Sequence, residues 1–199
     1  MRALAGSIVL LSLVVLAVLA VDRGAADLYA FGARYALDRG GPAGPQRGLE
    51  RAISLDAGNP DHHEYMARLH ESRGEYGQAL ERYRMAAKAR PASPRAWGEI
   101  AHLKLRLGQF DGELDRAIRS AARLGPWEPD VQLVIADVAM QGGPRLTPEA
   151  RLAALGLMSR ALKRYEKEVV QLAVQRGRID MLCSIPGIGT YPGAARRCI

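Results

Sequence analysis

Apolar positions along the chain follow two patterns. The nineteen residues from Ala3 to Val21 carry no charge, and only one glycine and two serines interrupt the apolar side chains. In a helix that rises about 1.5 Å per residue, such a segment is roughly 28 Å long, close to the hydrocarbon thickness of a bilayer. After Asp22 and Arg23, apolar residues recur at helical spacing, and alanine, leucine, arginine and glutamate dominate. The chain is therefore predicted to be all-α, with one long apolar helix at its N-terminus.

Residues 1–23 are predicted to form a transmembrane anchor, with a cleaved signal peptide as the open alternative. Val18-Leu19-Ala20 offers the small residues that a signal peptidase cut requires. The apolar run is longer than the core of a usual signal peptide, which favours the anchor. Arg2 is the only basic side chain before the run, so the positive-inside rule predicts a cytoplasmic N-terminus. We expect a single pass through a bacterial inner membrane, with the rest of the chain in the periplasm.

The exported part repeats with a period of 34 residues. The recurring columns are Ala33, Ala67 and Ala101; Gly40, Gly74 and Gly108; and Leu49 with Tyr83. From Leu114 onward the register falls one residue late, which indicates a single insertion after Phe110. Small residues let two helices approach closely, and glycine ends a helix, so this period predicts stacked helical hairpins.

These columns resemble the tetratricopeptide repeat family. Ala79-x3-Tyr83 and the following Pro91 match the second helix of that repeat, with tyrosine in place of the usual phenylalanine. The first helices keep the small residue and lose the final tyrosine, whose place Lys104 takes in the third unit. The resemblance covers residues 26–128 as three repeats. It implies an α-solenoid of helix-turn-helix units.

Residues 129–177 are predicted to add a degenerate repeat and a capping helix. Pro129 to Gln141 has the apolar spacing of a first helix, and Thr147 is the expected N-cap of the next, with Pro148 at its first position. A last helix over Glu166–Gln175 is expected to cover the end of the stack. The residues expected to face the core are Val131, Ile135, Val138, Ala139, Leu152, Leu155, Met158 and Leu162.

The tail, residues 178–199, holds both cysteines of the chain. An exported protein enters an oxidising compartment, so Cys183 and Cys198 are expected to form a disulfide; two unpaired thiols are the alternative. The four histidines lie far upstream, which argues against a zinc site. The segment 185–193 is rich in glycine and proline and is not expected to form a regular helix.

Sequence motifs of catalysis are not found, and we expect no enzyme, no cofactor and no metal. His62-His63-Glu64 lacks the spacing of a zinc-protease pair and is interpreted as a helix start with solvated polar residues. The formal net charge is +7, and since four of the 28 basic residues are lysines, the other 24 are arginines. Export removes nucleic acid as a partner. The positive charge suits anionic headgroups or an acidic polymer.

Tetratricopeptide stacks bind partners on a concave face lined by their first helices, and the resemblance implies such a face here. The 34-residue register puts Arg34, Arg68 and His102 in one column of it. Arginine side chains in a row favour carboxylate or phosphate groups. The residues expected beside this column are Glu64, Glu71, Arg95 and Arg106.

The expected function is that of a periplasmic scaffold that binds protein partners in an envelope assembly. The layout of anchor, repeats and cysteine-bearing tail also resembles small membrane-anchored tetratricopeptide proteins of exopolysaccharide biosynthesis and export systems. One alternative is direct binding of an anionic polysaccharide or lipid headgroup by the arginine-rich face. Another is an assembly factor for a respiratory or cell-division complex.

Overall fold

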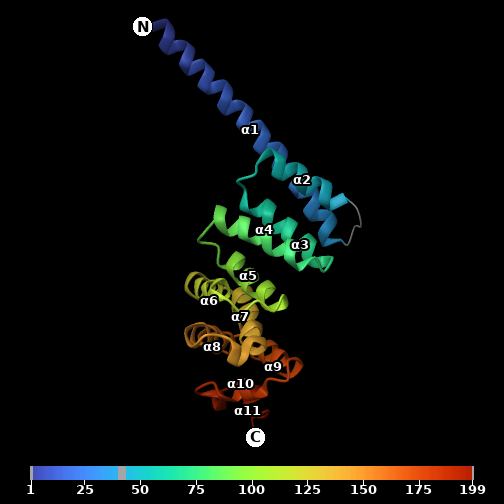
Figure 1. The fold of residues 1–199 in the computed structure, drawn as a ribbon, viewed down its shortest axis with the longest axis vertical. Coiled ribbons are helices and arrows are strands. Elements are labelled where there is room, and N and C mark those ends of the chain that lie inside the picture. Colours follow the sequence, from blue (N-terminus) through green and yellow to red (C-terminus); the bar gives the residue numbers. More distant parts are fainter. Residues whose placement is uncertain (1, 40–43, 199) are drawn as a thin grey trace.

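The computed structural model describes residues 2–39 and 44–198, and within these residues every regular element is a helix. The long elements are α1 (Arg2–Asp38), α2 (Gly44–Leu55), α3 (Pro60–Ser72), α4 (Tyr76–Ala89), α5 (Pro94–Arg106), α6 (Gly112–Leu124), α7 (Pro129–Gly142), α8 (Pro148–Leu162) and α9 (Glu166–Gln175). The short ones are η1 (Gly143–Arg145), α10 (Ile179–Cys183), η2 (Ile188–Thr190) and α11 (Pro192–Ala195). The predicted all-α class is confirmed. The helices stack along one axis, with the N-terminus and the C-terminus at opposite ends (Figure 1).

The helix α1 is continuous from Arg2 to Asp38, so the predicted anchor and the first helix of the repeats form one rod. Its first part projects from the stack (Figure 1), and the large apolar side chains from Leu10 to Val21 are exposed. Its second part buries Ala26, Ala30 and Ala33 against α2. A membrane-crossing helix, long and apolar enough for the purpose, is not found within 2–39 and 44–198. The anchor at 1–23 stays a prediction; its first residue lies outside the described part.

Neighbouring helices pair as antiparallel hairpins, α3 with α4, α5 with α6, and α7 with α8. The first helices of these hairpins begin at Pro60, Pro94 and Pro129, spaced as the sequence period predicts. Successive hairpins pack through α4 on α5, α5 on α7, and α6 on α8. One apolar cluster runs through all three hairpins, from Ala67 to Leu157. Alanine is common at these contacts, so the helices approach closely and the packing leaves little freedom for larger side chains.

One turn ends three of the first helices in the same way. Gly74, Gly108 and Gly177 have φ of 74°, 69° and 64°, the left-handed conformation that costs glycine little. After each glycine the next backbone N–H donates to a carbonyl five residues earlier, as Glu75 does to His70 over 2.9 Å. These hydrogen bonds satisfy carbonyl groups in the last turn of each helix. The predicted column of turn glycines is confirmed at 74 and 108, Gly40 lies outside the described residues, and Gly177 extends it.

The helix starts also follow the sequence. Asn59, Ser93 and Asp111 each accept a backbone N–H at the beginning of α3, α5 and α6. Thr147 caps α8 in the predicted way, accepting from the N–H of Ala150 at 3.3 Å, with Pro148 next to it. These caps fix where each helix begins and therefore which face it turns inward.

The third hairpin buries most of the residues expected of it. Val131, Ile135, Val138 and Ala139 are buried on α7, and Met158 and Leu162 on α8. The expectation for Leu152 is wrong, since 74% of this residue is exposed. On α8 the buried stripe runs instead through Ala150, Ala154, Leu157 and Ala161, and Leu155 is partly buried.

The end of the stack is covered by the tail rather than by α9 alone. A second apolar cluster joins Met140 and Leu162 to Val169 of α9 and to Leu182 and Ala194 of the tail. Cys183 and Cys198 form the predicted disulfide, with their Cα atoms 5.4 Å apart. The backbone N–H groups of Gly193 and Ala194 donate to Glu166, at 2.7 and 3.0 Å. The helix α9 is followed by α10 and α11, as each first helix of a hairpin is followed by a second. It therefore occupies the position of the first helix of a fourth hairpin after α3–α4, α5–α6 and α7–α8.

Candidate functional site

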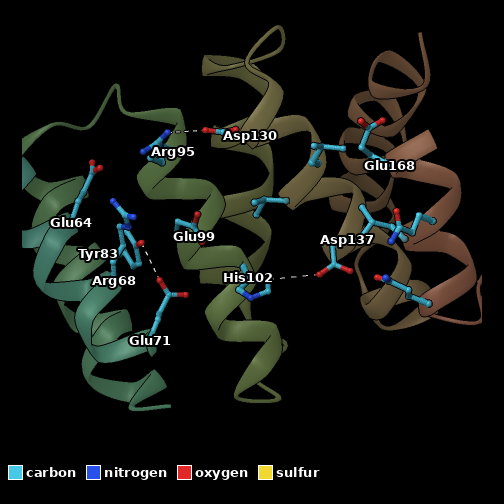
Figure 2. Close-up of a pocket in the computed structure, with 15 residues that line it drawn as sticks. Glu64, Arg68, Glu71, Tyr83, Arg95, Glu99, His102, Asp130, Asp137 and Glu168 are labelled. Carbon is cyan, nitrogen blue, oxygen red and sulfur yellow. Dashed lines mark hydrogen bonds and ion pairs between the residues drawn. The ribbon is translucent and has the colours of Figure 1, made fainter. Parts of the chain in front are cut away.

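A groove with a volume of about 790 Å³ runs along one side of the stack. Its walls come from α3, α5, α7 and α9, with Tyr83 of α4 behind α3. Figure 2 shows the labelled side chains across the groove, with Glu64 and Glu71 at one side, Glu99 and His102 in the middle, and Asp137 and Glu168 toward the other side. The lining residues are Glu64, Arg68, Glu71, Tyr83, Arg95, Glu99, His102, Asp130, Leu133, Val134, Asp137, Glu168, Gln171, Leu172 and Gln175.

The predicted column of Arg34, Arg68 and His102 is divided between two hollows. Arg68 and His102 line the groove. Arg34 lies beyond its end, in a smaller cavity of about 350 Å³ that also contains Arg68 and Arg95. There the guanidinium groups of Arg34 and Arg68 lie over the ring of Tyr65, at 5.6 and 6.0 Å from its centre. The smaller cavity is mixed in charge, because Asp61 and Glu64 line it as well.

Three of the four neighbours predicted for this column line the groove: Glu64, Glu71 and Arg95. Arg95 donates to Asp130 at 2.8 Å, so its charge is matched by a carboxylate of the next first helix. The fourth, Arg106, is not among the lining residues; its guanidinium lies over the ring of Tyr76 and donates to that hydroxyl.

The carboxyl groups of the groove are partly desolvated. Burial raises the pKa of Glu71, although Tyr83 donates a hydrogen bond to it at 3.1 Å. Burial, followed by the charge of Asp61, likewise raises the pKa of Glu64. For Glu99, burial and the neighbouring Glu71 raise the pKa to about 7. None of the described residues donates a hydrogen bond to the Glu99 carboxyl.

Asp137 is the centre of a hydrogen-bond cluster on the far side of the groove. Its carboxylate accepts from Arg176 at 2.7 and 2.9 Å and from Gln141 at 2.6 Å. The His102 ring lies 3.9 Å from it. Burial lowers the pKa of His102 in spite of this carboxylate, so we expect a neutral imidazole near neutral pH.

Sequence reasoning missed Glu99, Asp130, Asp137 and Glu168. Signals were available for three of them. Asp130 and Asp137 lie 35 residues after Arg95 and His102 and continue their columns past the insertion. Glu99 lies four residues after Arg95 and three before His102, so helical spacing places it on the same face of α5.

The histidine pair near the start of α3 is buried, which corrects the expectation of solvated side chains. His62 and His63 are 1% and 2% exposed. The Nε2 atom of His63 lies 2.9 Å from the carbonyl of Ala57, and that of His62 lies 3.4 Å from Asp27 of α1. The pair therefore packs α3 against its neighbours. In the described part of the chain, no three histidine, cysteine or carboxylate residues are placed to hold a metal ion.

Comparison of the sequence with protein-family models gives no match, and comparison with curated proteins gives none either.

Proposed function

We propose that this protein is a non-catalytic scaffold that holds a segment of a partner protein in its groove. The observation that carries the proposal is the continuity of the groove across the first helices α3, α5, α7 and α9. A surface built from equivalent faces of successive hairpins is extended and concave, and it suits a long segment better than a small molecule. Buried apolar side chains hold the hairpins in register, so the groove is formed before a partner arrives.

The family and the cellular setting are part of the same proposal. Glycine turns at Gly74 and Gly108, hairpins spaced by about 34 residues, and alanine-rich contacts support membership of the tetratricopeptide repeat family. The uncharged run in the first 23 residues supports an inner-membrane anchor with the repeats in the periplasm. The disulfide suits an oxidising compartment. We place the scaffold in an envelope assembly, with exopolysaccharide export as the first setting and respiratory or cell-division complexes as others.

Binding of an anionic glycan or lipid headgroup is the second candidate. Arg34, Arg68 and Arg95 favour it, since they meet in the smaller cavity. The carboxylates of Asp61 and Glu64 share that cavity and weaken its attraction for anions. Retention on an acidic glycan resin that salt reverses, and that falls when Arg34 and Arg68 are replaced, would favour this candidate over a protein partner.

Site-directed photo-crosslinking in the native host tests the scaffold. A photoreactive phenylalanine at Gln171, which lies on α9 and lines the groove, is expected to give an adduct with one protein that mass spectrometry identifies. The matched control places the same group at Leu152, exposed on the outer helix α8. Equal adducts at both positions, or none at Gln171, would contradict the proposal.

A further inference from the structure

The groove is acidic, although the chain as a whole is basic. Six carboxyl groups line it, against two arginines and one histidine of lowered pKa. Arg95 is paired with Asp130, and Asp137 is paired with Arg176 from outside the lining. The carboxylates remaining after these pairs are Glu64, Glu71, Glu99 and Glu168, which share the groove with Arg68. Among these remaining groups carboxyls outnumber cations, so the lining favours a cationic ligand.

Glu99 is the central group of this acidic lining. It lies on the middle helix α5, with Glu71 on one side and Asp130 on the other (Figure 2). The side chain is half-buried, and none of the described residues donates a hydrogen bond to it. A carboxylate in such surroundings gains a large stabilisation when a cation comes within hydrogen-bond distance, because the local dielectric constant is low.

Apolar side chains lie next to these carboxyl groups. Val134 and Glu99 line a common small hollow, and Leu133 and Leu172 continue the apolar part of the groove. A lysine or arginine side chain has the matching composition, with an aliphatic stem and a charged end. An acidic segment would instead bring further negative charge beside Glu71 and Glu99, which costs free energy in a partly dry groove.

We propose that the groove binds a basic segment of its protein partner, with one lysine or arginine side chain lying over Val134 and ending at the Glu99 carboxylate. This inference rests on the proposed scaffold function and adds the chemistry of the partner. It is opposite in sign to the carboxylate or phosphate ligand that the arginine column suggests. Charge complementarity also gives fast association and selects against acidic partners.

The test uses the full-length chain in mild detergent and three fluorescent decapeptides. In these peptides serine alternates with lysine, with glutamate or with glutamine, and fluorescence anisotropy at low ionic strength gives the affinities. The lysine peptide is expected to bind at least about tenfold more tightly than the other two, and Glu99→Gln is expected to weaken it by about tenfold. Glu149→Gln, the same change on the outer helix α8, is the control and should leave the affinity unchanged.

Two further measurements separate the possible results. Glu168→Gln removes an exposed carboxylate of the groove, so its smaller loss of affinity tests the inference even if Glu99→Gln disturbs the fold. Preference for the glutamate peptide, no preference at all, or equal losses in Glu99→Gln and Glu149→Gln would overturn the inference. In those cases a specific crosslink at Gln171 would leave the scaffold standing, whereas loss of that crosslink would remove both.

Discussion

Asp137 and Arg176 form a two-bonded ion pair that joins α7 to α9 beside the groove. The Asp137 side chain is 10% exposed and that of Arg176 is 34% exposed. The pair therefore differs from a surface salt bridge, because the carboxylate has little access to water if its partner is lost. It fixes the distance between two walls of the groove.

Removal of Arg176 is expected to destabilise the protein more than removal of both partners. Arg176→Ala leaves a buried carboxylate with Gln141 as its remaining close donor, and a loss of about 1–3 kcal/mol follows. The double variant with Asp137→Ala should recover part of that loss. Urea unfolding of the wild type, both single variants and the double variant measures the coupling. Additive single effects would show that the pair is not coupled.

Among the described residues that are less than 2% exposed, Lys104 has the largest side chain. Its ammonium lies 2.8 Å from Asp111, 2.7 Å from Glu113 and 3.2 Å from Gln109. Burial opposes the charge of Lys104, but the hydrogen bonds that its ammonium donates to Asp111 and Glu113 outweigh this effect, and the pKa of Lys104 is raised. Arg84, followed by Lys104, lowers the pKa of Glu113 to about 2. A charged network thus occupies the place where the repeat pattern has tyrosine.

Lys104→Met keeps the side-chain volume but removes the charged hydrogen bonds. We therefore expect it to reduce the free energy of unfolding by about 1–3 kcal/mol. Lys88→Met on the exposed face of α4 removes the same charge and should change stability by less than about 0.5 kcal/mol. Thermal or urea unfolding at neutral pH compares the two. A Lys104→Met variant as stable as the wild type would mean that apolar packing, not the network, fills this position.

Much of the fold was predictable because residues that begin and end helices recur in each repeat. Gly74 and Gly108 end helices, and Thr147 with Pro148 begins one, each for a local reason that a sequence displays. Leu152 was misassigned because α8 is apolar on more than one side, so spacing alone does not select the buried face. The continuity of α1 was also missed, since Asp22 and Arg23 suggest an end that the helix does not have.

The candidate site was predictable in place but not in charge. The 34-residue register located Arg68 and His102 on the groove. It gave no account of which arginines are paired, because Arg95 meets Asp130 and Arg176 meets Asp137 only across neighbouring helices. The net charge of the groove depends on such pairs. They form between residues of different helices, so the tertiary structure is needed to identify them.

Loss of the disulfide is expected to loosen the tail before the stack. The bond closes a loop of 15 residues, worth about 3 kcal/mol in the chain-entropy model. Since Leu182 and Ala194 remain buried against α9, the double variant Cys183→Ser, Cys198→Ser should stay folded. Hydrogen exchange should rise in the segment 184–197 while α3 to α6 keep their protection. A uniform rise along the chain would contradict this separation.

The titration of Glu99 predicts a pH-dependent stability. The charged or titratable groups around it are Glu64, Glu71, Tyr83, Arg95, Asp130 and, farther along the groove, Arg68, His102, Asp137 and Glu168. Its pKa in the folded protein, about 7, exceeds the value of about 4.5 in the unfolded chain. The folded state therefore favours the neutral carboxyl. The associated stability is fully present below about pH 4.5 and is lost as the pH rises through about 7.

Glu99→Gln keeps a neutral side chain at every pH, so its advantage over the wild type should grow as the pH rises from about 4.5, where the unfolded glutamate ionises, to about 7, where the folded one does. We expect nearly equal free energies of unfolding at about pH 4 and below, and a variant more stable by on the order of 2 kcal/mol above about pH 8. Urea unfolding across this range measures the difference, and Glu149→Gln should show no such pH dependence. The lysine peptide should bind the wild type more tightly as the pH rises through about 7, because the ionised Glu99 is the form that attracts it. Parallel stability curves for Glu99→Gln and the wild type would show that folding does not raise the pKa of this carboxyl.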